Sequence, residues 1–413
     1  MGLNDTPKSE RVHIAVFGKR NAGKSSLINS ITGQNLSIVS DVLGTTTDPV
    51  YKAMELLPLG PVMMIDTPGL DDVGKLGGMR VGKAMSVLNK SDIAVLVLDA
   101  QETQKKEIGF AFEKELYDRI QKKGIPCVLV INKIDLVSDW EVQKETTEAE
   151  LKKQFAGCEV ISVSAETKKQ IFELKELLGK QVPTDDTKLK IVGDLLEPGD
   201  FVVLVVPIDS AAPKGRLILP QQQTIRDILE AGAVSIVTRE TELVQTLEGL
   251  GKKPKLVITD SQAFKQVSKD TPDDILLTSF SILFSRFKGD LKLQVEGAKA
   301  VENLKDGDRI LMAEGCTHHR QCGDIGTVKL PSWIRKYTKK ELIFETSSGT
   351  EYPEDLSRYA MVVHCGGCML NKREMQFRLK EAQAQGIPIV NYGVMIAYLN
   401  GILKRSLEPF EKM

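Results

Sequence analysis

One segment near the N-terminus restricts the possible folds more than any other. Residues 12–17, VHIAVF, form an apolar, β-branched run that predicts a buried strand. The next eight residues, Gly18 to Ser25, read GKRNAGKS and match the pattern G-x-x-x-x-G-K-S/T. A helix-compatible stretch follows, with Gly33 as a plausible helix stop. The order of strand, glycine-rich turn and helix predicts a phosphate-binding loop on an α/β sheet.

The residues of this loop have separate chemical roles. Its glycines let the backbone curl around phosphate oxygens without a Cβ in the way, and its amides and the helix N-terminus bind the anion. Lys24 would reach the β- and γ-phosphates, and the Ser25 hydroxyl would ligate Mg²⁺. The residues expected to contact nucleotide here are Gly18, Asn21, Ala22, Gly23, Lys24, Ser25 and Ser26.

Two segments complete the phosphate side of the predicted site. Residues 66–69, DTPG, follow the strand-like run 62–65. Asp66 is expected to be the Walker-B acid, and Gly69 to offer an amide to the γ-phosphate. Residues 44–48, GTTTD, lie between the loop and DTPG and fit switch I.

Two further segments indicate the base. Residues 132–135, NKID, follow the strand-like run 127–131. The Asp135 carboxylate can accept from guanine N1–H and the 2-amino group, whereas adenine has an acceptor at N1 and no such amino group. Residues 164–165 follow the run 160–163, where a backbone amide would contact guanine O6. The residues expected on the guanine side are Asn132, Lys133, Asp135, Ser164 and Ala165.

These motifs, each after a strand, resemble the translation-factor-like class of GTPases. Alternating strands and helices point to an α/β fold, a P-loop GTPase domain with a mostly parallel sheet and helices on both faces. The segment 44–48 is similar to the GTTRD switch of the Era/TrmE-like group. That similarity implies that Thr46 ligates Mg²⁺ when GTP is bound. Thr47 stands where the group often has arginine.

Two residues bear on the rate of hydrolysis. Leu70 follows DTPG where Ras-like proteins place a water-orienting glutamine, so slow hydrolysis is expected unless another group substitutes. In the potassium-activated GTPases that this sequence resembles, the residue matching Asn21 binds K⁺ beside the phosphates. The alternative is that Asn21 only tolerates a tight turn, and both readings stay open. The expected catalytic residues are Asn21, Lys24, Ser25, Thr46, Asp66 and Gly69.

The cysteines and histidines are concentrated late in the chain. Of six Cys and four His, seven lie between residues 316 and 368. Cys316-Thr317-His318 is followed, after 45 residues, by His364-Cys365-Gly366-Gly367-Cys368. A C-x-x-C pair puts two sulfurs on one turn, close enough to share a metal or cluster, and Cys316 supplies a third thiolate. The spacing leaves structural zinc and an iron–sulfur cluster open.

A second α/β pattern separates the two motif regions. Strand-like runs at 201–208, 234–238 and 255–260 alternate with helix-like stretches. We find no chemistry in this region and interpret it as a packing or oligomerisation module. The first pattern fades near Lys180, and residues 181–188, QVPTDDTK, are typical of a linker.

A GTPase domain, a middle α/β module and a C-x-H plus H-C-x-x-C pattern together resemble the family of [FeFe]-hydrogenase maturation GTPases. The resemblance covers essentially the whole chain. It implies a GTPase domain at 1–180, a dimerisation domain at 189–270 and a cluster-binding domain at 271–413. It also implies a homodimer that scaffolds and carries the diiron subcluster of the hydrogenase. Such a carrier accepts this precursor from two radical-SAM maturases and hands it to the apo-hydrogenase.

The same resemblance implies a metal centre. A [4Fe-4S] cluster would be held by Cys316, Cys365 and Cys368. Its fourth position would be exchangeable, and His318 and His364 match the histidines of the family motif. Two extra residues of the region, His319 and Cys322, leave the identity of the fourth cluster ligand open.

Composition argues against several other functions. Lys and Arg total 55, Asp and Glu 56, and a net charge of -1 does not favour nucleic-acid or anionic-membrane binding. No apolar stretch approaches the roughly 20 residues that span a bilayer, and the N-terminus lacks the apolar core of a signal peptide. A cytoplasmic protein is expected, in which cysteines favour metal or redox chemistry over disulfides. The alternative function is a ribosome- or tRNA-associated GTPase with structural zinc, which predicts a basic surface.

Overall fold

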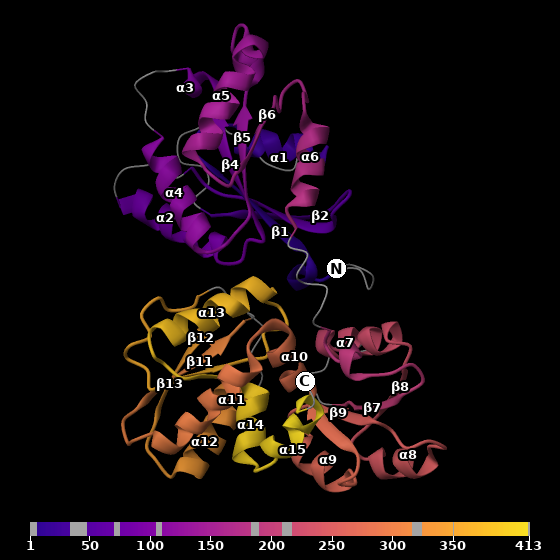
Figure 1. Cartoon of the computed structure of the whole chain (residues 1–413). Coiled ribbons are helices and arrows are strands. Elements are labelled where there is room, and N and C mark those ends of the chain that lie inside the picture. The colour runs from indigo at the N-terminus through magenta and orange to yellow at the C-terminus, as the bar shows by residue number, and fades with distance from the viewer. Residues whose placement is uncertain are drawn as a thin grey trace. The chain divides into compact units, whose positions relative to one another are not determined.

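The chain divides into two compact units, Met1–Thr184 (unit 1) and Asp185–Met413 (unit 2). Figure 1 draws the computed structural model of the whole chain. Within the described residues, no helix has the length and apolar character needed to cross a membrane. The structure describes residues 6–33, 48–69, 75–104, 110–182, 190–208, 217–315, 324–349 and 351–411, without the side chains of 75–81.

Unit 1 is built on a sheet whose six described strands lie in the order β2-β3-β1-β4-β5-β6. Every neighbouring pair is parallel except β2 with β3, which is antiparallel. The strands are β1 (Val12–Gly18), β2 (Val50–Leu56), β3 (Gly60–Asp66), β4 (Ile93–Asp99), β5 (Cys127–Asn132) and β6 (Glu159–Ser162). The mostly parallel P-loop sheet that the sequence predicts is confirmed.

Helices cover both faces of this sheet, and for that reason its central strands are apolar on both sides. One face packs against α2, α4 and α5 through residues such as Leu88, Leu116 and Leu151. The other packs against α1 and α6 through residues such as Leu27 and Leu174. The helices are α1 (Lys24–Thr32), α2 (Lys75–Leu88), α3 (Ala100–Thr103), α4 (Ala111–Lys122), α5 (Trp140–Gln154) and α6 (Ile171–Lys180).

Unit 2 contains two four-stranded sheets among its described residues, and all strand pairs in both are parallel. The first has the order β10-β9-β7-β8, with β7 (Phe201–Val205), β8 (Val234–Thr238), β9 (Leu256–Thr259) and β10 (Leu276–Ser279). The second has the order β12-β11-β13-β14, with β11 (Arg309–Glu314), β12 (Ile343–Ser348), β13 (Met361–His364) and β14 (Ile389–Asn391). The fold is therefore a six-stranded, mostly parallel sheet followed by two further parallel α/β modules.

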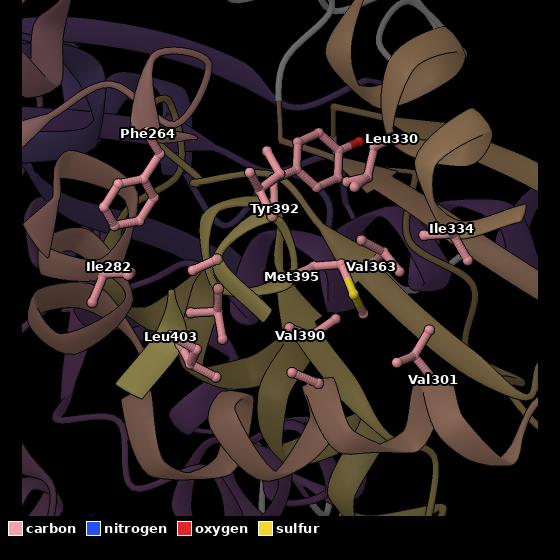
Figure 2. Close-up of a cluster of buried hydrophobic side chains, with 14 of the residues drawn as sticks. Phe264, Ile282, Val301, Leu330, Ile334, Val363, Val390, Tyr392, Met395 and Leu403 are labelled. Atoms are coloured by element: carbon pink, nitrogen blue, oxygen red, sulfur yellow. The ribbon is translucent and has the colours of Figure 1, made fainter. Parts of the chain in front are cut away.

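A single apolar core joins the two sheets of unit 2. Figure 2 shows Phe264 and Ile282, which flank the first sheet, around the same core as Val363 and Val390 of the second. Met395 packs in this core and is fully buried. The helices of unit 2 are α7 (Leu219–Glu230), α8 (Leu243–Gly249), α9 (Phe264–Asp270), α10 (Phe280–Lys288), α11 (Leu291–Lys299), α12 (Leu330–Thr338), α13 (Lys372–Ala384), α14 (Tyr392–Leu399) and α15 (Leu403–Leu407).

The buried His13 on β1 makes the stability of unit 1 depend on pH. Its side chain lies in the sheet, with Nδ1 2.8 Å from the carbonyl oxygen of Arg11. Burial, with a smaller contribution from the charge of Lys90, lowers the pKa of His13 to about 4. The unfolded chain, with an ordinary pKa of about 6.5, binds the proton first as pH falls. Stability from this group is therefore complete above about pH 6.5 and is lost between pH 6.5 and 4.

We expect His13→Gln to weaken this pH dependence. Between pH 4 and pH 7 the free energy of unfolding of native unit 1 should rise by about 3 kcal/mol more than that of the variant. Urea unfolding followed by Trp140 fluorescence in a Trp333→Phe background reports unit 1, because these are the only two tryptophans. Carboxylates titrate in the native protein and in the variant alike, so their contribution cancels when the two unfolding free energies are subtracted. A stability difference that is the same at pH 7 and pH 4.5 would refute the assignment.

Candidate functional site

The predicted nucleotide segments meet at one edge of the sheet in unit 1. Parallel neighbours present their carboxyl ends together, and β1, β3, β5 and β6 each end at a predicted segment. The P-loop, 18–25, follows β1, and DTPG begins with the last residue of β3. NKID begins with the last residue of β5, and residues 164–165 follow β6.

The phosphate side brings together the groups expected to serve Mg²⁺ and phosphate. The Ser25 hydroxyl donates to Asp66 Oδ2 over 2.6 Å, so a hydroxyl and a carboxylate oxygen are adjacent, as a hard cation requires. Lys24 is 7% exposed, and its Nζ donates to the carbonyl oxygens of Gly18 at 3.0 Å and Lys19 at 2.7 Å. Its ammonium therefore lies within the loop where a phosphate would be held. Ser26 follows in the first turn of α1.

A single buried side chain joins three of the predicted segments. Asn132 is 1% exposed; its Nδ2 donates to the carbonyl oxygen of Ala22 over 3.2 Å, and its Oδ1 accepts from the Ala165 amide over 3.1 Å. Gly23 has φ +88°, and a Cβ there would collide with the Asn132 amide nitrogen. Asn132 thus fixes the P-loop relative to residues 164–165, and the Ala165 amide is engaged with it here. The Ser164 hydroxyl accepts from the Thr167 amide over 3.0 Å.

The remaining guanine-side residues lie beside Asn132. Lys133 has a left-handed backbone with φ 65°, and its Nζ donates to Asp99 Oδ2 over 2.7 Å. Asp135 lies in the short turn Ile134–Leu136 and is exposed, so its carboxylate is accessible to a base. Asp99, which the sequence analysis did not single out, ends β4 in the same way that the predicted residues end their strands.

Two positions of the phosphate side, Gly69 and Asn21, are restricted by close approach or by backbone conformation. A Cβ added at Gly69 would lie 3.0 Å from the Arg20 backbone, so DTPG approaches the P-loop closely and a larger residue would push the two segments apart. Asn21 is exposed with φ 58°, a left-handed conformation that asparagine tolerates. This conformation accounts for Asn21 without an ion, and a K⁺ site at Asn21 stays a prediction.

A further contact of the P-loop was not foreseen. Lys19 Nζ lies 3.0 Å from Glu113 Oε1, and Glu113, on α4, is 1% exposed. The pair anchors the loop to the helix face. No pattern in the sequence marks Glu113, because its role depends on where α4 packs.

Several predicted residues lie outside the described residues. They belong to switch I, the position after DTPG and the first metal segment. Their roles remain predictions. They are Thr46, Thr47, Leu70, Cys316, His318, His319 and Cys322.

The second candidate site lies at the carboxyl edge of the last sheet. Strands β11 and β13 pair in parallel with Ala313 opposite His364, so residues just beyond both strands are neighbours. The amide of Gly315, the residue before Cys316, donates to Cys365 Sγ over 3.0 Å, and the Gly367 amide donates to the same sulfur over 3.4 Å. Among the described residues, no three His, Cys, Asp or Glu converge on a metal position.

The C-x-x-C loop fits a thiolate-bound centre. Gly367 has φ +62°, and a Cβ there would collide with Met375 Sδ, so the turn requires glycine. Burial raises the pKa of the Cys368 thiol, while the positive charge of Lys288 acts against that rise. Amides directed at sulfur and a nearby cation are features that stabilise thiolate ligands. This donor set suits iron or zinc equally.

His364 has partners on both ring nitrogens. It is 1% exposed, its Nδ1 lies 2.7 Å from the Cys365 carbonyl oxygen, and its Nε2 lies 3.0 Å from Arg378 Nη1. His364 Nε2 accepts a hydrogen bond from Arg378, and His364 Nδ1 donates one to the Cys365 carbonyl oxygen. This arrangement requires a neutral imidazole ring. Burial and the Arg378 charge lower the pKa of His364 to about 3. A ligand role for His364 would require it to leave Arg378.

Arg378 is itself part of a buried network that the sequence did not reveal. It is fully buried on α13, and its Nε donates to Glu374 Oε1 over 3.0 Å. Its Nη2 donates to the Gly349 carbonyl oxygen over 2.6 Å, and its guanidinium lies 5.0 Å from the centre of the Tyr352 ring. The network supports the His364 side of the C-x-x-C loop.

Two curated relatives are GTPases, and each matches less than half of this chain. "GTPase Der" of Wolinella succinogenes is 34% identical over 176 residues, 41% of this chain and 35% of the relative. "tRNA modification GTPase MnmE" of Thermoanaerobacter sp. is 34% identical over 182 residues, 44% of this chain and 36% of the relative. The chain therefore spans little more than a third of these curated relatives. A crystal structure of Aquifex aeolicus Era is 21% identical, covers 58% of this chain and 98% of its own, and has a TM-score of 0.38, too low to support a conclusion.

Three family models match the chain, and each matched region contains most or all of one of the three sheets. Residues 13–133 match the model described as "50S ribosome-binding GTPase", so unit 1 is a P-loop GTPase domain, a fold that binds GTP with Mg²⁺. Residues 191–289 match the "Hydrogen maturase F dimerization domain", and residues 292–409 match its "tetramerization domain". Both descriptions concern self-association. Because these two models account for nearly all of unit 2 behind a GTPase domain, the chain belongs to the hydrogen maturase F family, the maturation GTPases of [FeFe]-hydrogenase.

Proposed function

We propose that the chain is a slow GTPase and an iron–sulfur scaffold that carries the diiron subcluster to apo-[FeFe]-hydrogenase. The observation that carries this proposal is the cysteine loop at the carboxyl edge of the last sheet, within the region that matches the hydrogen maturase F tetramerization model. The same chain has a P-loop whose Ser25 lies beside Asp66, and these two residues would bind Mg²⁺ with GTP. Residues 1–180 would be the GTPase domain, 189–270 the dimerisation domain and 271–413 the cluster domain. The protein would act in the cytoplasm as a homodimer.

In the GTPase domain, each residue has a task that the geometry supports. Lys24 would exchange its two carbonyl partners for phosphate oxygens, and Ser25 would place its hydroxyl beside Asp66 on Mg²⁺, with Thr46 completing the set. The ion would neutralise charge on the transferred phosphoryl group. Gly69 would bring its amide to the γ-phosphate, since it already lies against the P-loop.

In the cluster domain, Cys316, Cys365 and Cys368 would hold a [4Fe-4S] cluster. A histidine, His318 or His364, or another exchangeable ligand would take the fourth position. To bind iron, His364 would have to give up its contacts with Arg378 and the Cys365 carbonyl. The chain would receive the diiron precursor, its cargo, from two radical-SAM maturases and release it to the apo-hydrogenase.

The alternative is a ribosome- or tRNA-associated GTPase with structural zinc. The description of the GTPase model and the name of one relative favour it. The GTPase model covers residues 13–133 and the relative matches 44% of this chain, whereas the two hydrogen maturase F models cover unit 2. We therefore favour the maturation role.

Guanine selection by Asp135 can be tested by changing the base. Asp135→Asn should weaken GTP binding about tenfold to a hundredfold, because a charged acceptor facing two donors is lost. The same variant should bind xanthosine triphosphate better than the native protein does, since the new amide can donate to O2. Nucleotide titration measures both. Asp139→Asn, an exposed acid four residues away, is the matched control. A native preference for ATP would overturn the guanine assignment.

The K⁺ proposal predicts a cation-dependent rate. GTP hydrolysis should be faster in K⁺ than in Na⁺ at equal ionic strength, because the smaller Na⁺ would fit poorly. Asn21→Gly retains access to the left-handed backbone and removes only the amide. This variant should hydrolyse GTP at the same rate in both salts. Equal native rates in K⁺ and Na⁺ would leave Asn21 as a turn residue.

The GTP and metal sites should be separable, because they lie in different compact units. Cys365→Ser should lose most reconstituted iron and its visible absorption, since a hydroxyl is a harder and far less acidic ligand than a thiol. It should hydrolyse GTP at close to the native rate. Lys24→Ala should lose hydrolysis and retain its iron. Both variants should fail to activate apo-hydrogenase if turnover is required.

Cys158→Ser is the matched control for the cysteine, because it makes the same change at a free cysteine of unit 1, away from the C-x-x-C loop. It should bind iron as the native protein does. Loss of GTP hydrolysis in Cys365→Ser, with the fold intact by circular dichroism, would contradict separability.

A further inference from the structure

A buried lysine lies beside the C-x-x-C loop and has no place in the function proposed above. Lys288 is the last residue of α10 and is 2% exposed. Removing an ammonium group from water costs several kcal/mol, so lysine is rarely buried without a compensating role. Its Nζ lies over the Phe284 ring, 5.7 Å from the ring centre.

The ammonium group is directed at the segment that closes the loop. Lys288 Nζ donates to the carbonyl oxygen of Leu370 over 3.1 Å and lies 3.5 Å from that of Cys368. The Leu370 amide in turn donates to the Gly367 carbonyl oxygen over 3.0 Å. Asn371, the next residue, caps α13 by accepting from the Glu374 amide. Lys288 therefore holds the link between the second cysteine and the following helix.

The lysine and the loop belong to different modules of unit 2. Lys288 lies in the region 191–289 that matches the dimerization model, and Cys368 lies in the region 292–409 that matches the tetramerization model. The first module thus contributes a positive charge to the edge of the second. Arg378, which reaches the other side of the loop through His364, comes from the second module itself.

We propose that Lys288 is a positioning residue for the metal centre, one that fixes the Cys368 segment and places a positive charge beside its thiolates. The inference rests on the proposed metal site at Cys365 and Cys368. A cluster held by several thiolates is a net anion and becomes more negative when reduced. A fixed cation nearby therefore favours the reduced form and opposes loss of the metal.

The test compares Lys288→Met, Lys288→Gln and Lys288→Arg after anaerobic reconstitution with iron and sulfide. Met removes the charge and retains an unbranched stem, Gln retains a donor without the charge, and Arg retains the charge. Lys292→Met is the control, because it removes an exposed lysine charge on the neighbouring helix α11. Thermal unfolding of each apo-protein establishes that it folds.

Two quantities are measured: the reduction midpoint potential of the centre and the rate of iron loss to a chelator. Lys288→Met and Lys288→Gln should both shift the potential to more negative values and lose iron about tenfold faster. Lys288→Arg and Lys292→Met should match the native protein. If Lys288→Met does not fold, Lys288→Gln decides alone. A folded neutral variant with native potential and native iron loss would overturn the inference.

The failure of the proposed cluster is distinguishable from the failure of this inference. If the native protein takes up zinc and no cluster, the proposed function fails. The Lys288 variants are then compared by zinc loss to a chelator. The neutral variants should still lose metal about tenfold faster, because the thiolates are the same anions. Equal zinc loss in native and neutral variants would overturn the role of Lys288.

Discussion

Parallel strand pairing determines where both candidate sites of this protein can form. Strands that run side by side in the same direction end together, and residues far apart in sequence meet beyond their carboxyl ends. In unit 1 this edge gathers Ser25 at the start of α1, Asp66 at the end of β3 and Asn132 at the end of β5. In unit 2 the pairing of β11 with β13 brings the backbone before Cys316 against the sulfur of Cys365. The same constraint thus operates twice in one chain.

Buried polar side chains then fix the loops that leave these edges. Asn132 joins the P-loop to residues 164–165 in unit 1, while Lys288 and Arg378 support the cysteine loop in unit 2. Burying such groups costs free energy unless each finds its partners, and each of these does. Buried polar groups of this kind are expected where a loop must keep one geometry in order to bind a ligand.

The sequence revealed the segments whose chemistry is local and missed the contacts that depend on packing. The strand predicted at 234–238 is β8, and the run 12–17 is β1 shortened by one residue. The antiparallel edge strand β2 was not predicted, because its exposed and half-buried residues alternate without a long apolar run. The sheet of the middle module also includes β10, which ends at Ser279 and was not predicted as a strand. Lys288 was likewise invisible, since a lysine at a helix end is usually exposed.

The most direct test of the account is to determine which metal the protein takes up when iron with sulfide or zinc is offered to Cys365 and Cys368. Protein purified without air should be offered iron with sulfide, and separately zinc, and its metal and sulfide contents should be measured per chain. The account predicts about four irons with matching sulfide, and retention of that iron when zinc is added in equal amount. Uptake of one zinc per chain, with no stable iron and sulfide under any of these conditions, would contradict the cluster and the carrier function with it.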